Sequence, residues 1–141
     1  MEAKDYEPKY PVPDYIKDTG ADYQHTVAHQ VAYDFSIYLH LKMRRLPKYE
    51  KFSLQQEIRH TADDLLDELE IYEVTKSASH LYSADRLKRR LMRKIRTAHD
   101  LKYSAINTDA MKYCAIQISI IGKCIGGLIE MEKEKRQKRQ V

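Results

Sequence analysis

Apolar residues recur at steps of three and four along most of the chain, which is the period of an amphipathic α-helix. The pattern predicts four helices, over about residues 26–46, 53–76, 83–104 and 107–132. Pro47 ends the first helix, because a proline disfavours helical geometry in the residue before it. No segment alternates with the period of two that is typical of a strand, so the chain is predicted to be all-α.

Capping residues and apolar positions support these helices. Ser53 begins a Ser-x-x-Gln capping box, Ser83 is expected to cap the third helix, and Asn107 or Thr108 the fourth. The apolar positions expected to face the core are Val31, Phe35, Tyr38, Leu39, Leu46, Ile58, Ala62, Leu65, Leu69, Tyr72, Leu87, Leu91, Ile95, Ala98, Met111, Cys114, Ile118, Ile121, Ile125 and Leu128.

The order of elements predicts one domain with two appendages. Four amphipathic helices joined by short loops predict an antiparallel, up-down four-helix bundle over residues 26–132. Residues 1–25 contain three prolines and four tyrosines without helical spacing, and they are expected to form an extended or disordered arm. Residues 133–141 are expected to be a charged C-terminal tail.

Composition favours a binding protein in the cytoplasm. The formal net charge of +4 is compatible with nucleic acid or with an acidic protein partner. Cys114 and Cys124 lie too far apart on one helix to form a disulfide, and they are expected to be reduced. The first residues do not resemble a signal peptide, and Lys123 interrupts the longest apolar stretch, so no membrane span is expected.

The third predicted helix separates apolar and basic residues onto opposite sides. No acidic residue lies between the first and the last of its arginines, which leads us to expect that they meet anions outside the chain. Arginine suits carboxylates and phosphates equally well. The arginines of this stripe are Arg86, Arg89, Arg90, Arg93 and Arg96.

A purely structural explanation of this stripe stays open. The second helix carries six acidic residues and no lysine or arginine between Thr61 and Val74, so neighbouring helices could pair their charges. A stripe opposite the core faces away from the adjacent helix, however, so only flanking residues such as Lys88 and Lys94 should reach across.

A second basic group lies around the end of the first helix. It comprises Lys42, Arg44, Arg45, Lys48 and Lys51. Cations there also interact favourably with the negative end of a helix dipole, so a binding role and a structural role stay equally open. The basic residues of the tail are expected to be solvated.

The sequence contains no pattern typical of an active site. His25 and His29 are four residues apart, but no HExxH pattern and no nearby cysteine accompany them, so neither a metal nor another cofactor is expected. Phosphate-binding loops and nucleophile motifs are also absent, and we expect no enzyme activity. Gly122, Gly126 and Gly127 lie inside the fourth helix and are expected to allow close packing, within the bundle or between subunits.

Two segments resemble a known family. Residues 46–58, which run from Leu-Pro-Lys-Tyr through the capping box, and residues 121–128, Ile-Gly-Lys-Cys-Ile-Gly-Gly-Leu, are similar to the Avd proteins. These are the accessory variability determinants of diversity-generating retroelements, and the broader family includes four-helix proteins encoded by intervening sequences of large-subunit ribosomal RNA genes. The resemblance covers about residues 28–130, and Leu128 departs from the aromatic residue that often follows the paired glycines.

The resemblance implies a homopentamer of four-helix subunits that binds a reverse transcriptase and its template RNA, or an RNA/DNA hybrid, without catalysing a reaction. The alternative that stays open is a structural homo-oligomer of the ribosomal intervening-sequence type, without a polymerase partner. A neighbouring reverse-transcriptase gene would distinguish the two. The residues expected to contact RNA or polymerase are Arg86, Arg89, Arg90, Arg93, Lys94, Arg96, Arg44, Arg45 and Lys48.

Overall fold

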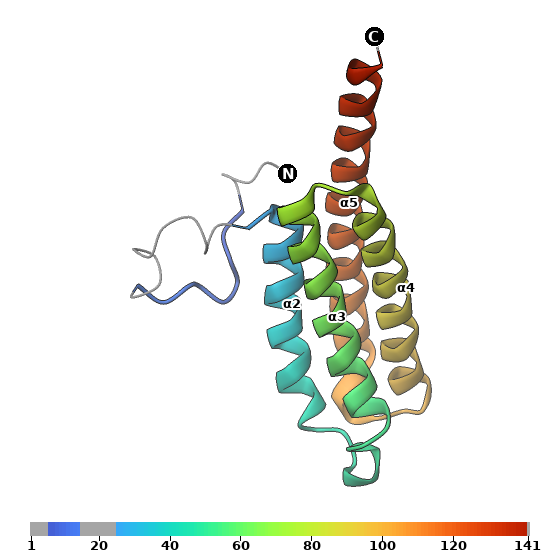
Figure 1. Ribbon diagram of the computed structural model, residues 1–141. Coiled ribbons are helices and arrows are strands. Elements are labelled where there is room, and N and C mark those ends of the chain that lie inside the picture. Colours follow the sequence, from blue (N-terminus) through green and yellow to red (C-terminus); the bar gives the residue numbers. More distant parts are fainter. Residues whose placement is uncertain (1–5, 15–24, 141) are drawn as a thin grey trace.

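Four long helices make up most of the protein (Figure 1). The computed structural model describes residues 6–14 and 25–140 and contains no strand within them. The chain is therefore all-α, as predicted. The long helices are α2 (Val27–Met43), α3 (Leu54–Thr75), α4 (Ala78–Asp100) and α5 (Thr108–Arg139), and the short 3₁₀ helices are η3 (Lys48–Glu50) and η4 (Ser104–Ile106).

Local signals placed some helix ends correctly and missed others. Asn107 is the N-cap of α5, and its side chain accepts a hydrogen bond from the Ala110 amide, as expected. Ser53 is at the N-cap position of α3, but the predicted capping box is absent because its hydroxyl donates to Glu50 instead.

The prediction that Ser83 begins the third helix is wrong. Helix α4 begins at Ala78, with Ser77 in extended geometry at the N-cap. Lys76 adopts a left-handed conformation, with φ of 57°, and so reverses the chain within two residues. The earlier start also buries Leu81 completely, which extends the apolar seam of α4 by one turn.

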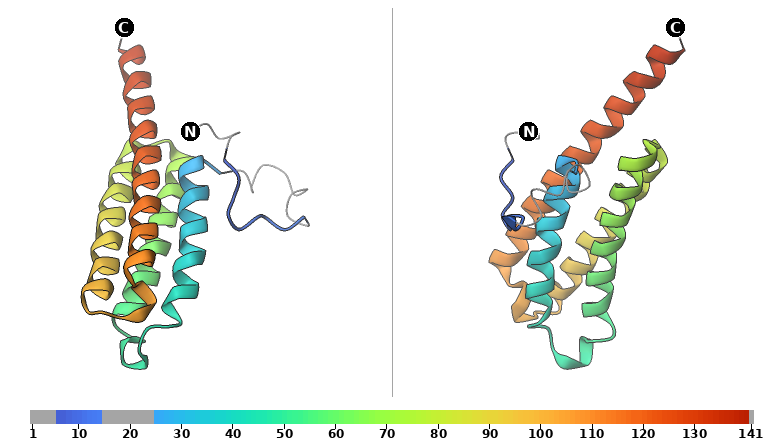
Figure 2. Two further views of the ribbon diagram at one scale, coloured as in Figure 1. Left: turned by 180° about the vertical axis from the view of Figure 1, so that it is seen from behind. Right: turned by 60° about the vertical axis from the view of Figure 1, so that its left-hand side comes forward.

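One core lies between the four helices. Helix α3 packs against α2 and α4, and α5 packs against the same two helices from the opposite side (Figure 2). Most predicted core positions are buried, whereas Tyr38, Leu87, Met111 and Leu128 are partly buried at its edge. Four helices around one core are consistent with a four-helix bundle.

Hydrogen bonds connect the helix ends at both poles of the core. At one pole, the amide and hydroxyl of Thr26, just before α2, donate to Glu73 in the last turn of α3. At the opposite pole, the Tyr103 hydroxyl donates to Glu50 of η3, with 2.6 Å between the oxygens. The start of α2 therefore lies beside the end of α3, and η3 lies beside the segment between α4 and α5.

Helix α5 continues well past the core. It extends to Arg139 and projects beyond the other three helices (Figure 1). The expectation that it fades near residue 132 is therefore wrong. Glutamate and lysine are good helix formers, and the pairs Lys133–Glu130 and Lys135–Glu132 are spaced by one turn. The charged tail is thus largely helical.

Part of the N-terminal arm lies against the helices. The Tyr6 hydroxyl and the Lys9 amide both donate to the buried carboxylate of Asp34 in α2. The Lys9 ammonium group lies over the ring of Tyr113 in α5. Residues 1–5 and 15–24 of the predicted arm lie outside the described residues.

Among the described residues, α5 is long and apolar enough to span a membrane by length and composition. Only 22% of its most apolar 18-residue window is buried inside the protein. A core helix of a soluble protein meets the same criteria. These properties therefore do not distinguish a membrane span from a helix whose apolar surface is covered by other protein.

A buried hydrogen bond ties α5 to α3 where α5 leaves the core. The Tyr72 hydroxyl donates to Glu132, with 2.7 Å between the oxygens. We expect Tyr72→Phe to lower the free energy of unfolding by about 1.5–3 kcal/mol near neutral pH, the usual contribution of a hydrogen bond to a charged group. Denaturant unfolding of the two proteins measures this difference.

The same pair predicts a pH dependence. The hydrogen bond from Tyr72 holds the pKa of Glu132 below its ordinary value of 4.5. Its contribution is therefore complete above that value and is lost as the pH falls through the lowered pKa, so the difference between the two proteins should shrink in acid. Tyr82→Phe, at an exposed position, is the control; equal stability of Tyr72→Phe and wild type near neutral pH would contradict the expectation.

Candidate nucleic-acid and protein interface

The arginines of α4 all face solvent. Leu91, Ile95 and Ala98 turn the opposite side of the helix into the core and are fully buried. The predicted separation of apolar and basic sides is therefore confirmed. The exposed arginines are Arg86, Arg89, Arg90, Arg93 and Arg96.

The expectation that all these arginines lack partners within the helix is wrong at two positions. Asp85 and Asp100 lie just outside the acid-free interval. Arg89 pairs with Asp85 at 3.1 Å, and Arg96 pairs with Asp100 at 3.5 Å. Both arginine side chains remain about three-quarters exposed, so these pairs contribute little to stability.

Arg90 and Arg93 remain without an ion pair to any described residue. With Lys94 they line a groove between α4 and α3, and Glu57, His60 and Asp64 are among its other residues. Lys94 pairs with Glu57 of α3 at 3.0 Å, as expected if neighbouring helices pair their charges. Within the described chain, none of the five arginines pairs with an acidic residue of α3. Lys88 pairs with Asp85 of its own helix instead. Two guanidinium groups at the middle of the stripe are thus available to an external anion.

The second basic group lies next to two exposed aromatic rings. Arg44, Arg45 and Lys48 are exposed, and Tyr49 and Phe52 follow them in the loop. The exposed fractions of Tyr49 and Phe52 are 76% and 82%, although burying such rings in the core would be favourable. Exposed aromatic rings beside cations are typical of surfaces that bind single-stranded nucleic acid.

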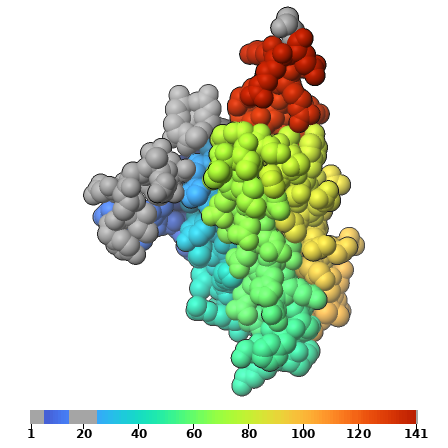
Figure 3. Space-filling model, in the orientation of Figure 1, coloured from blue at the N-terminus to red at the C-terminus, as the bar shows by residue number. Residues whose placement is uncertain are grey.

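Phe52 lies next to residues of both basic groups, which are far apart in the sequence. It lines the groove of Arg90 and Arg93, and also a second groove with Lys51 and Arg59. The Lys51 ammonium group lies 5.4 Å from the centre of the Phe52 ring. Figure 3 shows this face, with the loop before α3 at its lower end and α4 at its right edge. Sequence reasoning missed Phe52, although its position directly after Lys51 was a usable signal.

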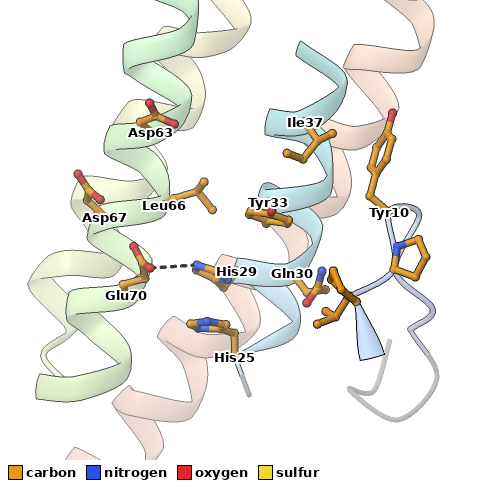
Figure 4. Close-up of a pocket in the computed structure, with 13 residues that line it drawn as sticks. Tyr10, His25, His29, Gln30, Tyr33, Ile37, Asp63, Leu66, Asp67 and Glu70 are labelled. Carbon is orange, nitrogen blue, oxygen red and sulfur yellow. Dashed lines mark ion pairs between the residues drawn. The ribbon is translucent and has the colours of Figure 1, made fainter. Parts of the chain in front are cut away.

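The acidic residues of α3 meet histidines instead of arginines. His40 lies 3.8 Å from Asp63, and His80 lies 2.8 Å from Glu68. In the groove between α2 and α3, His29 lies 3.6 Å from Glu70 (Figure 4). The acidic and basic faces therefore do not neutralise one another, with the Lys94–Glu57 pair as an exception.

His25, His29 and Glu73 form a compact cluster beside this groove. Their nearest nitrogen and oxygen atoms all lie within 4.8 Å of one another. Burial, with a smaller contribution from the neighbouring His25, lowers the pKa of His29 to about 4. Burial acts to raise the pKa of Glu73, but hydrogen bonds from His25 and Thr26 outweigh it and lower the pKa overall. The histidine spacing was visible in the sequence; the approach of Glu73, 44 positions after His29, was not.

The glycines of α5 are not required by packing within the chain. A Cβ atom added at Gly126 or Gly127 would meet nothing within 4 Å. One added at Gly122 would meet the end of the flexible Lys88 side chain at 2.8 Å. No backbone of a described neighbouring helix lies close to any of the three, which leaves packing between subunits as the expectation for them.

The two cysteines are unsuited to nucleophilic chemistry. Both are free thiols; burial raises the pKa of Cys114 to about 12 and also raises the pKa of Cys124. A thiol that stays protonated is a poor nucleophile.

No protein-family model, curated protein or solved structure matches this chain. The described geometry by itself supports electrostatic binding of a polyanion along α4 and the loop before α3.

If Arg90 and Arg93 serve binding and not folding, their loss should leave stability unchanged. We expect the double variant Arg90→Ala/Arg93→Ala to unfold within about 0.5 kcal/mol of wild type, since exposed substitutions rarely have larger effects. Leu91→Ala, one position away but fully buried, should cost about 2–5 kcal/mol. Chemical denaturation compares them, and a large loss in the double variant would show that these arginines support the fold.

Proposed function

We propose that this chain is a non-catalytic accessory protein of a diversity-generating retroelement, which binds the reverse transcriptase and the template RNA and so supports mutagenic cDNA synthesis. In this proposal the four helices form an antiparallel, up-down bundle, five copies assemble into a ring, and the protein acts in the cytoplasm. The polymerase supplies the catalysis.

The observation that carries the proposal is the pair Arg90 and Arg93 beside Phe52. Two exposed guanidinium groups without a carboxylate partner in the described chain offer charge to phosphates, and the exposed ring offers a stacking surface to an unpaired base. Arg44, Arg45 and Lys48 would extend this positive surface at the same pole. The resemblance of residues 46–58 to Avd proteins covers the same loop and the start of α3.

Co-purification of the reverse transcriptase with its template RNA tests the proposal. We expect Arg90→Ala/Arg93→Ala and Phe52→Ala each to reduce recovery of the ternary complex at least tenfold, because phosphate contacts and base stacking both contribute to such binding. The matched control is Arg136→Ala/Arg139→Ala, which removes two exposed arginines from the projecting end of α5. Equal recovery with all variants would contradict the proposal.

Self-association is the second part of the proposal, and α5 carries the support for it. Ile116 is 58% exposed and Met131 is 39% exposed, and the open space beside Gly126 and Gly127 leaves room for a neighbour to approach their backbone. A subunit interface on α5 would cover this apolar surface. The same observation supports the second candidate function, a structural homo-oligomer of the ribosomal intervening-sequence type.

Gly126→Ala separates helix propensity from assembly. Within the isolated chain it should raise the free energy of unfolding by about 0.5–1 kcal/mol, because alanine is the better helix former and the space is free. If the glycine contacts another subunit, the same change should lower the oligomer mass measured by sedimentation or light scattering. Val74→Ala, a change at an exposed position of α3, is the control for the effect of helix propensity. If Gly126→Ala leaves the oligomer mass unchanged, Gly126 does not lie in the subunit interface.

A further inference from the structure

We propose that His25, His29 and Glu73 form a binding site for a divalent transition-metal ion of the zinc class, which ties the start of α2 to the end of α3. This inference is independent of the proposed retroelement function. The side chains come from both sides of the junction: His25 immediately precedes the N-cap residue Thr26, His29 is in the first turn of α2, and Glu73 is in the last turn of α3.

The cluster has the donor chemistry that zinc prefers. Two imidazole nitrogens and one carboxylate oxygen are typical ligands of Zn²⁺, and three protein ligands leave a position for water. The candidate ligand atoms lie within 4.8 Å of one another, and His25 lies before the helix, where its ring can adjust. Hard cations such as Mg²⁺ prefer sites built from oxygen alone and should compete poorly.

Hydrogen bonds hold the Glu73 carboxylate in a fixed orientation, as a metal ligand requires. Its Oε2 atom accepts hydrogen bonds from the Thr26 amide at 2.7 Å and from the Thr26 hydroxyl at 2.9 Å. Its Oε1 atom lies 2.7 Å from Nδ1 of His25. Because the Thr26 contacts fix one oxygen, the other is oriented toward the histidines, as second-shell hydrogen bonds orient ligands in metal sites.

His29 supplies a second, independent observation. Its exposed fraction is 5%, and its Nδ1 atom is buried without a hydrogen-bond partner within the described chain. A buried polar atom left unpaired is destabilising, so native proteins rarely keep one without a reason. Coordination through Nδ1 would satisfy this atom and would leave the Nε2 proton facing the Glu70 carboxylate, 3.6 Å away. A carboxylate behind a ligating histidine is a common arrangement at zinc sites.

The position of the site suggests what the metal would do. Thr26 caps α2 through its contact with the His29 amide at 3.2 Å, so the cluster surrounds the point where the chain enters the helix core. A metal ion there would link the residue before the N-cap of α2 to the last turn of α3. It would therefore hold the chain in place where it enters α2. The rings of His25 and His29 stack with 3.8 Å between their centres and 20° between their planes, so the His25 ring must rotate for both histidines to reach one ion.

Titration of the metal-free, untagged full-length protein with Zn²⁺ tests the site. Calorimetry should find one ion bound per chain, and thermal unfolding should shift upward when Zn²⁺ is present. Co²⁺ in the same site should give the intense visible absorption of a tetrahedral complex. His25→Gln and Glu73→Gln should each weaken Zn²⁺ binding at least tenfold.

The controls make either outcome decisive. His60→Gln changes a histidine in a different groove and should bind Zn²⁺ as wild type does. His25 is exposed, so His25→Gln should fold even if a change at buried His29 does not. Absence of saturable binding, or equal binding by His25→Gln and wild type, would overturn the proposal.

Discussion

The structure depends on one constraint, which is that four apolar seams must meet along a single core. Each helix has one such seam, and burying it leaves the opposite side of the helix in solvent. In α4 that opposite side is made of arginines, because Leu91, Ile95 and Ala98 occupy the core positions between them. The exposed positive stripe is thus a direct consequence of the packing that folds the chain.

The distribution of charge over the helices matters more than its sum. The net charge is only +4, but the acidic side chains of α3 mostly face histidines. The arginines of α4 either pair with aspartates of their own helix or have no carboxylate partner in the described chain. The surface therefore has an acidic side along α3 facing α2 and a basic side along α4.

Much of the fold could be predicted from the sequence because it depends on local periodicity. The apolar seam of α3 gave the correct core residues, the seam of α5 gave four of its six, and Asn107 gave the correct start of α5. The start of α4 was missed because Ser77 and Ser83 are equally good local caps, and only the complete burial of Leu81 distinguishes them.

The candidate sites depend on contacts between distant residues, which periodicity does not contain. The exposure of the five arginines followed from their position on the helix, and the pairing of Arg89 with Asp85 was visible as i, i+4 spacing. The approach of Glu73 to His25 and His29, and of Phe52 to Arg93, depends on how separate helices pack.

In the proposed function, the middle of the α4 stripe binds RNA phosphates. The most direct measurement is the affinity of the purified protein for template RNA over a range of salt concentrations, for wild type and for Arg90→Ala/Arg93→Ala. We expect the slope of log affinity against log salt to become shallower by about 1.4 in the double variant, since each phosphate contact to single-stranded RNA contributes about 0.7. Identical slopes and affinities in the two proteins would contradict it.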